Sequence, residues 1–158
     1  MKNAWKDIQL LVLDFDGVLT DGFVYVDQDG HETVRCSRRD GLGIALLAER
    51  GVKTLVISKE KNNVVAARCQ KLGIEYFSGV DDKAPLLEKI LKEKGVDASR
   101  VCYMGDDVND VDCIRLAGIG AAPANAVQAA KDTADYVTRA NGGDHAVREI
   151  CDLIAEAT

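Results

Sequence analysis

The chain has 158 residues, of which 47% are hydrophobic and 29% are charged, and its formal net charge is −6. These values are typical of a globular protein, and we expect one domain over residues 1–158. The negative charge disfavours a nucleic-acid-binding protein, because such proteins carry clustered positive charge. No apolar run approaches the ~18 residues of a membrane span, and the five cysteines form no C-x-x-C pair. We therefore expect reduced thiols in a cytoplasmic protein that binds neither nucleic acid nor membrane.

Strand-like and helix-like segments alternate along the chain. The expected strands are residues 9–14, 53–57, 74–77, 101–104, 119–121 and 136–137. The expected helices are residues 40–50, 62–72, 83–94, 108–117, 126–130 and 146–155. Repeated strand–helix units of this spacing predict an α/β protein, a Rossmann-like three-layer sandwich in which helices cover both faces of a parallel central sheet.

A β-hairpin interrupts this alternation early in the chain. Residues 23–26 and 32–36 have the pattern of short strands, and the Asp27-Gln28-Asp29-Gly30 segment between them is a strong turn signal. The first strand carries four apolar residues in succession, more apolar surface than a free two-stranded arm can leave exposed. We therefore expect the hairpin to be a flap that is buried between the subunits of a homotetramer.

Two carboxylates follow the first strand, in the segment Asp14-Phe15-Asp16-Gly17. Gly17 indicates that the strand has ended, so both acids are expected where the chain turns out of the sheet. The carboxyl edge of the strands is where open α/β folds bind ligands. One acid can attack a substrate while its neighbour moves a proton, and two acids in contact need a cation to coexist.

Polar residues also follow later strands. They are Ser58, Lys83 and the pair Asp106-Asp107, and parallel strands bring such residues to one edge of the sheet. A carboxylate nucleophile, a hydroxyl, a lysine and further acids predict a phosphoryl-transfer site. Asp14 is expected to attack phosphorus and to hold Mg²⁺ together with Asp106. Ser58 and Lys83 are expected to bind the phosphate oxygens.

These segments resemble the motifs of the haloacid dehalogenase superfamily. The resemblance rests on D-x-D-G-V-x at residues 14–19, Ser58, Lys83 and G-D-D-x-x-D at residues 105–110. It implies that Asp14 forms an aspartyl-phosphate, and that Asp16 protonates the leaving oxygen and then deprotonates water. It also implies that the backbone carbonyl of residue 16 is a further metal ligand. Two further acids, Asp107 and Asp110, are expected to support the site.

The spacing of the motifs leaves no room for the cap domain of many superfamily members. Residues 20–53 hold only the hairpin and one helix, and residues 58–83 hold one helix and a strand. The chain thus resembles a capless group of oligomeric sugar-acid phosphatases, in which neighbouring subunits close each other's sites. Residues 38–43 and 142–149 match signatures of that group. The resemblance implies a sugar-acid phosphate as the substrate.

The residues after Ser58 bear on the choice of sugar. Glu60, Arg68 and Lys71 resemble the branch that acts on nine-carbon 2-keto-3-deoxynononate and N-acetylneuraminate 9-phosphates, in sialic acid biosynthesis. With Arg39, these residues are the expected substrate-binding set, although Glu60, Arg68 and Lys71 can also form a solvated charged face. The alternative is a 3-deoxy-D-manno-octulosonate 8-phosphate phosphatase of lipopolysaccharide biosynthesis. A non-catalytic tetramerisation module, like the domains fused to CMP-sialate synthetases, would not need the complete set of site residues.

Overall fold

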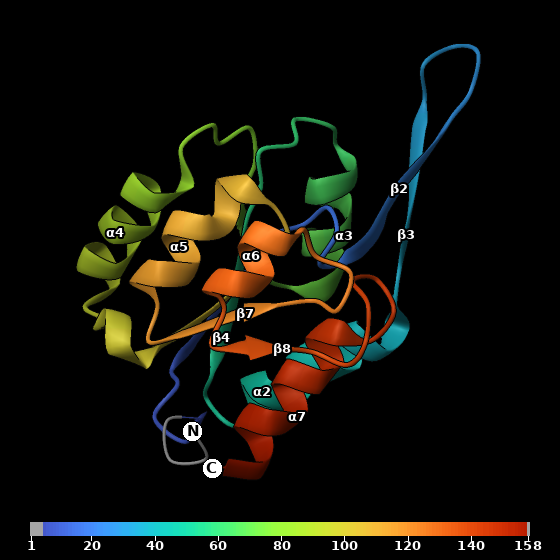
Figure 1. Cartoon of the computed structure of the whole chain (residues 1–158). Helices are drawn as coiled ribbons and strands as arrows, with labels where there is room; N and C mark the ends of the chain where they lie inside the picture. The colour runs from blue at the N-terminus through green and yellow to red at the C-terminus, as the bar shows by residue number, and fades with distance from the viewer. Residues whose placement is uncertain (1–4, 158) are drawn as a thin grey trace.

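The computed structural model describes residues 5–157 and has a six-stranded parallel sheet at its centre (Figure 1). The order of the strands across the sheet is β5-β4-β1-β6-β7-β8. Their bounds are Leu10–Leu13 for β1, Lys53–Ile57 for β4, Glu75–Phe77 for β5, Val101–Met104 for β6, Ile119–Ala122 for β7 and Tyr136–Val137 for β8. Each neighbouring pair runs parallel, as the alternation of strands and helices predicts.

Helices cover both faces of this sheet. Their bounds are Arg38–Glu49 for α2, Val64–Leu72 for α3, Lys83–Lys94 for α4, Val111–Leu116 for α5, Gln128–Thr133 for α6 and Ala146–Ala157 for α7. On one face, α2, α3 and α7 pack over Leu11 and Leu13 of β1; on the other, α4, α5 and α6 pack over Leu10 and Val12. The predicted three-layer α/β sandwich is confirmed. Within residues 5–157, no helix has both the length and the hydropathy to cross a bilayer.

The central strands are apolar along their whole length because both of their faces are covered. All four residues of β1 and all four of β6 are buried. Such continuous burial is typical of inner strands of a parallel sheet, which need no polar face. The five cysteines are all free thiols, four of them buried in the apolar clusters on the two faces of the sheet, and burial raises the pKa of each thiol. They are therefore packing residues with little reactive thiolate.

Four predicted helices are found with ends shifted by at most two residues, and the other two differ more from the observed ones. The expected helix over residues 108–117 begins with a separate 3₁₀ turn, Val108–Asp110, before α5. Asp107 and Asp110 form a capping box there, which stabilises the start of the 3₁₀ turn. The expected helix over residues 126–130 is displaced to Gln128–Thr133, because Val127 is extended and donates its N–H to the carbonyl of Asp106 at 2.9 Å.

The hairpin projects away from the body of the molecule (Figure 1). Its strands, β2 (Thr20–Val26) and β3 (Glu32–Cys36), form a separate antiparallel sheet. β2 begins three residues before the predicted start, since Thr20 already pairs with Cys36 ahead of an irregularity in the register. Phe23 is 76% exposed and Tyr25 is 69% exposed. The predicted flap is thus present, and apolar side chains on it face solvent in the single chain.

Candidate active site

A polar pocket lies at the carboxyl ends of β1, β4 and β6. Its volume is about 240 Å³, and its wall includes Asp14, Asp16, Ser58, Glu60, Asp106 and Asp107. Asp14 and Ser58 directly follow β1 and β4, and Asp106 follows β6 after one glycine. The structure therefore brings together the strand-end residues that the sequence singled out. It also adds Gly22 and Asn109 to the wall, which no motif had indicated.

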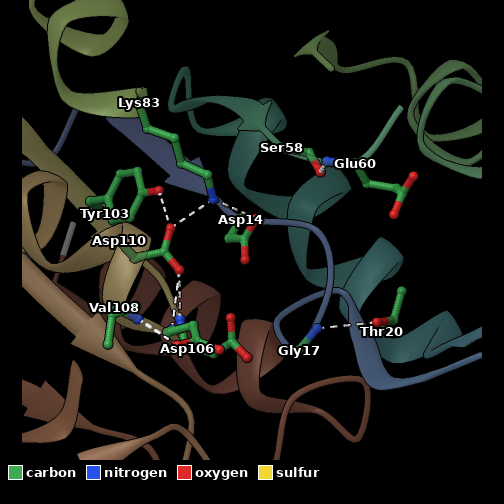
Figure 2. Close-up of polar contacts among 11 residues, drawn as sticks. Asp14, Gly17, Thr20, Ser58, Glu60, Lys83, Tyr103, Asp106, Val108 and Asp110 are labelled. Atoms are coloured by element: carbon green, nitrogen blue, oxygen red, sulfur yellow. Dashed lines mark hydrogen bonds and ion pairs between the residues drawn. The ribbon is translucent and has the colours of Figure 1, made fainter. Parts of the chain in front are cut away.

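Lys83, the first residue of α4, does not itself line the pocket but directs its ammonium group at Asp14, which does (Figure 2). Its Nζ lies 2.8 Å from Oδ1 of Asp14 and 2.8 Å from Oδ1 of Asp110. The lysine is 1% exposed. Burial alone would lower the pKa of Lys83, but attraction by the two carboxylates outweighs burial and raises it. The ammonium is thus a fixed positive charge beside Asp14.

Asp110 joins the residues around Asp14 by accepting four hydrogen bonds. Besides Lys83, its Oδ1 accepts from the hydroxyl of Tyr103 at 2.6 Å. Its Oδ2 accepts from the backbone N–H of Asp106 at 3.0 Å and of Asp107 at 3.3 Å. Sequence reasoning missed Tyr103, although a lone tyrosine within a buried apolar strand signals a hydroxyl that needs a partner. Burial, followed by the charge of Asp110, raises the pKa of Tyr103, so its hydroxyl remains a donor.

The pocket offers oxygen ligands for a divalent cation. Carboxylate oxygens of Asp14, Asp106 and Asp110 lie within 4.8 Å of one another. Asp110 already accepts four hydrogen bonds, which leaves Asp14 and Asp106 as the carboxylates able to bind an ion. Burial raises the pKa of Asp14, with the charge of Asp110 adding to the effect, and burial raises the pKa of Asp106 to about 6. A hard cation such as Mg²⁺ fits this donor set and would offset both shifts.

Asp16 lines the pocket together with Asp14 and is half-buried. Burial, with repulsion from Glu60 and then Glu32, raises the pKa of its carboxyl. A carboxyl group with a raised pKa can carry a proton to a leaving group. The loop is held by Thr20, whose Oγ1 accepts from the N–H of Gly17 at 3.1 Å (Figure 2) and from the N–H of Gly22 at 3.1 Å. Thr20 is a second residue that sequence reasoning missed.

The segment before α7, which contains Gly142 and Gly143, packs closely against the loop after β1. A β-carbon on Gly142 would lie 1.7 Å from the carbonyl oxygen of Gly17, and one on Gly143 would lie 2.2 Å from the nitrogen of Asp21. The N–H of Gly143 donates to the carbonyl of Val18 at 2.9 Å. The Gly142-Gly143 pair is therefore required for the chain before α7 to pack against the loop that carries Asp16.

Ser58 and Glu60 belong to the loop after β4. Ser58 is 1% exposed, and its Oγ accepts from the N–H of Glu60 at 3.1 Å. Oε1 of Glu60 accepts from the N–H groups of Lys61 and Asn62, at 2.8 Å each. Glu60 therefore lines the pocket, as a substrate-binding residue would, while one of its oxygens stabilises its own loop.

The comparisons with known proteins identify the family. A family model described as haloacid dehalogenase-like hydrolase matches residues 48–150. The 3-deoxy-D-manno-octulosonate 8-phosphate phosphatase of Escherichia coli strain K12 is 37% identical over 150 residues, covering 94% of this chain and 80% of the relative. The chain belongs to the haloacid dehalogenase-like hydrolases.

Solved structures show the same relationship in three dimensions. The 3-deoxy-D-manno-octulosonate 8-phosphate phosphatase of Moraxella catarrhalis, in complex with magnesium, phosphate and KDO, is 35% identical with a TM-score of 0.96 over 99% of this chain and 91% of that one. The cobalt-bound deoxy-D-mannose-octulosonate 8-phosphate phosphatase of Haemophilus influenzae is 33% identical, with a TM-score of 0.93 over 98% of this chain and 91% of that one. This hydrolase is a phosphatase of the capless group.

The expected substrate-binding residues are not all at the pocket of this phosphatase. Arg68 and Lys71 line a different groove of about 410 Å³ between β3 and α3, which shares no lining residue with the pocket of Asp14. One guanidinium nitrogen of Arg68 donates to the carbonyl of Ser37 at 3.1 Å. Arg39 is exposed in the first turn of α2. Within one chain, the structure therefore does not bring Arg68 and Lys71 to Glu60.

Proposed function

We propose that this phosphatase hydrolyses 3-deoxy-D-manno-octulosonate 8-phosphate, releasing the sugar acid and inorganic phosphate. The observation that carries the chemistry is the buried contact of Asp14 with Lys83, at 2.8 Å, beside Asp106 at the carboxyl edge of the sheet. The substrate is supported by relatives with this activity in their names, 80% of whose length the chain covers. The expected nine-carbon substrate is not confirmed, and the comparisons favour this eight-carbon alternative.

The reaction proceeds in two steps on the carboxylates of the first loop. An oxygen of Asp14 attacks phosphorus, the bond from phosphorus to the sugar oxygen breaks, and Asp16 donates its proton to that oxygen. Asp16 then takes a proton from water as the water oxygen attacks the phosphorus of the aspartyl-phosphate. The second step releases phosphate and restores Asp14. The raised pKa of Asp16 suits its role as the acid in the first step.

The remaining residues stabilise charge. Lys83 and Ser58 bind the phosphate oxygens, on which negative charge is concentrated in the transition state. The cofactor is Mg²⁺, held by the carboxylates of Asp14 and Asp106 and the backbone carbonyl of Asp16. When bound, Mg²⁺ neutralises the charge of the phosphoryl group and of the two carboxylates. Asp107 and Asp110 support the site, Asp107 by accepting from the N–H of Val108 at 2.6 Å.

A nine-carbon 9-phosphate remains a second candidate because of Glu60. This residue lines the pocket, one of its oxygens is not used within its own loop, and it can accept from sugar hydroxyls. Arg68, Lys71 and Arg39 can join it only if a neighbouring subunit brings them to the pocket. We propose such a homotetramer, in which the apolar side chains of the hairpin are buried. The free cysteines support a reducing, cytoplasmic location.

Phosphate release from the purified protein distinguishes the two sugars. The eight-carbon 8-phosphate and the two nine-carbon 9-phosphates are compared with p-nitrophenyl phosphate at saturating Mg²⁺. A kcat/KM at least tenfold higher for the octulosonate ester supports the proposal, and a preference of that size for a nine-carbon ester supports the second candidate. If a neighbouring subunit brings Arg68 to the pocket, Arg68→Ala should lower kcat/KM for the preferred sugar acid while leaving p-nitrophenyl phosphate unaffected, because that substrate has no carboxylate.

A further inference from the structure

Two donors converge on one oxygen of Asp110 beneath the pocket, and one of them is Tyr103. Building on the proposed function, we propose that Tyr103 is a positioning residue for Lys83. Its hydroxyl occupies part of the hydrogen-bonding capacity of Oδ1 of Asp110 and so leaves the ammonium of Lys83 shared with Asp14 and available to the phosphoryl group. Tyr103 acts through Asp110, because it does not line the pocket.

The hydrogen-bond inventory of Asp110 supports this role. A carboxylate offers about four acceptor sites, and those of Asp110 are filled by Tyr103 and Lys83 on Oδ1 and by two backbone N–H groups on Oδ2. Figure 2 shows the hydroxyl of Tyr103 and the ammonium of Lys83 both directed at this carboxylate. Without the hydroxyl, Lys83 would be the only donor to Oδ1 of Asp110. This oxygen would then attract the ammonium of Lys83 more strongly.

The position of Lys83 is sensitive to such a change. Its Nζ is equally distant from Asp14 and Asp110, at 2.8 Å each, and both contacts are largely shielded from water, because Lys83, Asp110 and Asp14 are 1%, 0% and 6% exposed. Electrostatic interactions in such dry surroundings are stronger than in water. A stronger pull from Asp110 therefore moves the ammonium away from Asp14 and from the position of the phosphate.

The surroundings of Tyr103 make it a rigid support. The residue belongs to the central strand β6, lies opposite Val12 of β1 in the register of the sheet and is fully buried. Its ring packs in the core cluster that also contains Leu87 and Cys113. The hydroxyl is thus held in place from the sheet, while Lys83 comes from α4 and Asp110 from the 3₁₀ turn before α5.

Tyr103→Phe tests the proposal, because it removes the hydroxyl and keeps the ring. Tyr136→Phe is the matched control, since the Tyr136 hydroxyl also donates to a carboxylate, Oε1 of Glu149 at 2.7 Å, but lies on β8 away from the pocket. With p-nitrophenyl phosphate, Tyr103→Phe should lower kcat about tenfold and weaken inhibition by inorganic phosphate by a similar factor. The Mg²⁺ affinity of this variant should stay within about twofold of the wild-type value, because the backbone N–H groups of Asp106 and Asp107 still donate to Oδ2 of Asp110. Tyr136→Phe should change none of these constants.

A double-mutant cycle isolates the dependence on Lys83. Inhibition by inorganic phosphate is measured for Lys83→Ala, with and without Tyr103→Phe; the second substitution should then have no further effect. Wild-type kcat and phosphate inhibition in Tyr103→Phe would overturn the proposal, as would an undiminished effect in the Lys83→Ala background. Loss of Mg²⁺ affinity would also overturn it, by placing the effect on Asp106 and Asp107. Failure of the proposed function has a different signature, in which the wild-type protein and Asp14→Asn are equally inactive.

Discussion

Gly17 and Asp106 approach so closely that a β-carbon at position 17 would lie 1.9 Å from Oδ2 of the aspartate. Gly17 also has φ of +80°, in the left-handed region that favours glycine. The loop after β1 can therefore close on the acid after β6 only because residue 17 has no side chain. This contact brings the two predicted Mg²⁺ ligands, which are 92 residues apart in the sequence, to the same pocket.

Gly17→Ala should abolish Mg²⁺ binding and activity, because the new methyl group displaces Asp106. Gly30→Ala is the control, since Gly30 has φ of +81° but no atom within 4 Å of an added β-carbon. Both variants incur a similar backbone cost of about 1–2 kcal/mol for an L-residue in the left-handed region, so their melting temperatures report strain and calorimetry with Mg²⁺ reports the clash. Equal Mg²⁺ affinity in the two variants would contradict this account.

Asp14→Asn should reduce turnover by several orders of magnitude, since the amide keeps the shape but cannot attack phosphorus. The fold should be retained, because burial already disfavours the charged form of Asp14, as its raised pKa shows. Phosphate release and circular dichroism measure the two effects. Asp97→Asn, at an exposed turn, is a control that should leave turnover unchanged. More than a tenth of wild-type turnover in Asp14→Asn would rule out Asp14 as the nucleophile.

Removal of the cation should stop the reaction. Exhaustive chelation leaves the ammonium of Lys83 as the positive charge beside the carboxylates of Asp14 and Asp106, which together carry more negative charge, and added Mg²⁺ should restore full turnover. Asp106→Ala should weaken Mg²⁺ binding by at least tenfold in calorimetry. The matched variant Asp107→Ala should retain Mg²⁺ affinity, because Asp107 is exposed and caps the following turn. If Asp106→Ala bound Mg²⁺ with unchanged affinity, Asp106 would not be a ligand of the ion.

The stability of the protein should depend on pH through Asp40. This residue is 0% exposed; its Oδ1 accepts from the N–H of Arg148, and its Oδ2 has no hydrogen-bond partner among residues 5–157. Burial raises the pKa of Asp40 to about 6 from an ordinary value of 3.8. The folded protein thus binds this proton more tightly than the unfolded chain. The resulting stability is complete below pH ~4 and is lost as the pH rises through about 6.

Asp40→Asn tests this dependence, because asparagine keeps the shape and the acceptor but does not titrate. Unfolding by urea is measured for both proteins between pH 4 and 7, without metal. The free energy of unfolding of the wild type should fall by about 2 kcal/mol relative to the variant over this range. Other buried carboxylates titrate equally in both proteins, so the difference isolates Asp40. A constant difference across the range would show that Asp40 keeps an ordinary pKa.

The hairpin should hold the proposed homotetramer together. Replacing Phe23 and Tyr25 with serine removes the two most exposed aromatic side chains of the hairpin, which the single chain leaves without an apolar contact surface. Light scattering should show a shift from tetramer to smaller species, with unchanged circular dichroism. Val137→Ser, at an exposed position of the outer strand β8, should leave the tetramer intact. An active wild-type monomer at micromolar concentration would contradict the tetramer.

Local patterns in the sequence were sufficient for the architecture and for the positions of the motifs. The apolar run of β1 predicts a covered strand, and Gly73 and Gly95, both in the left-handed region, end α3 and α4 where the sequence places them. Because parallel strands share one carboxyl edge, the order of Asp14, Ser58, Lys83 and Asp106 in the chain already predicts a common site. These features depend on neighbours within a few residues, which a sequence displays directly.

The contacts that complete the site were decided by the tertiary structure alone. The hydroxyl of Tyr103 on Asp110, the packing of Gly142 on Gly17 and the separation of Arg68 from Glu60 each depend on how distant segments meet. Spacing along one helix puts Arg68 and Lys71 on a common face, but the direction of that face is determined by how α3 packs on the sheet. Side-chain partnerships of this kind arise from close packing and the need to satisfy buried polar groups, which act between residues far apart in sequence.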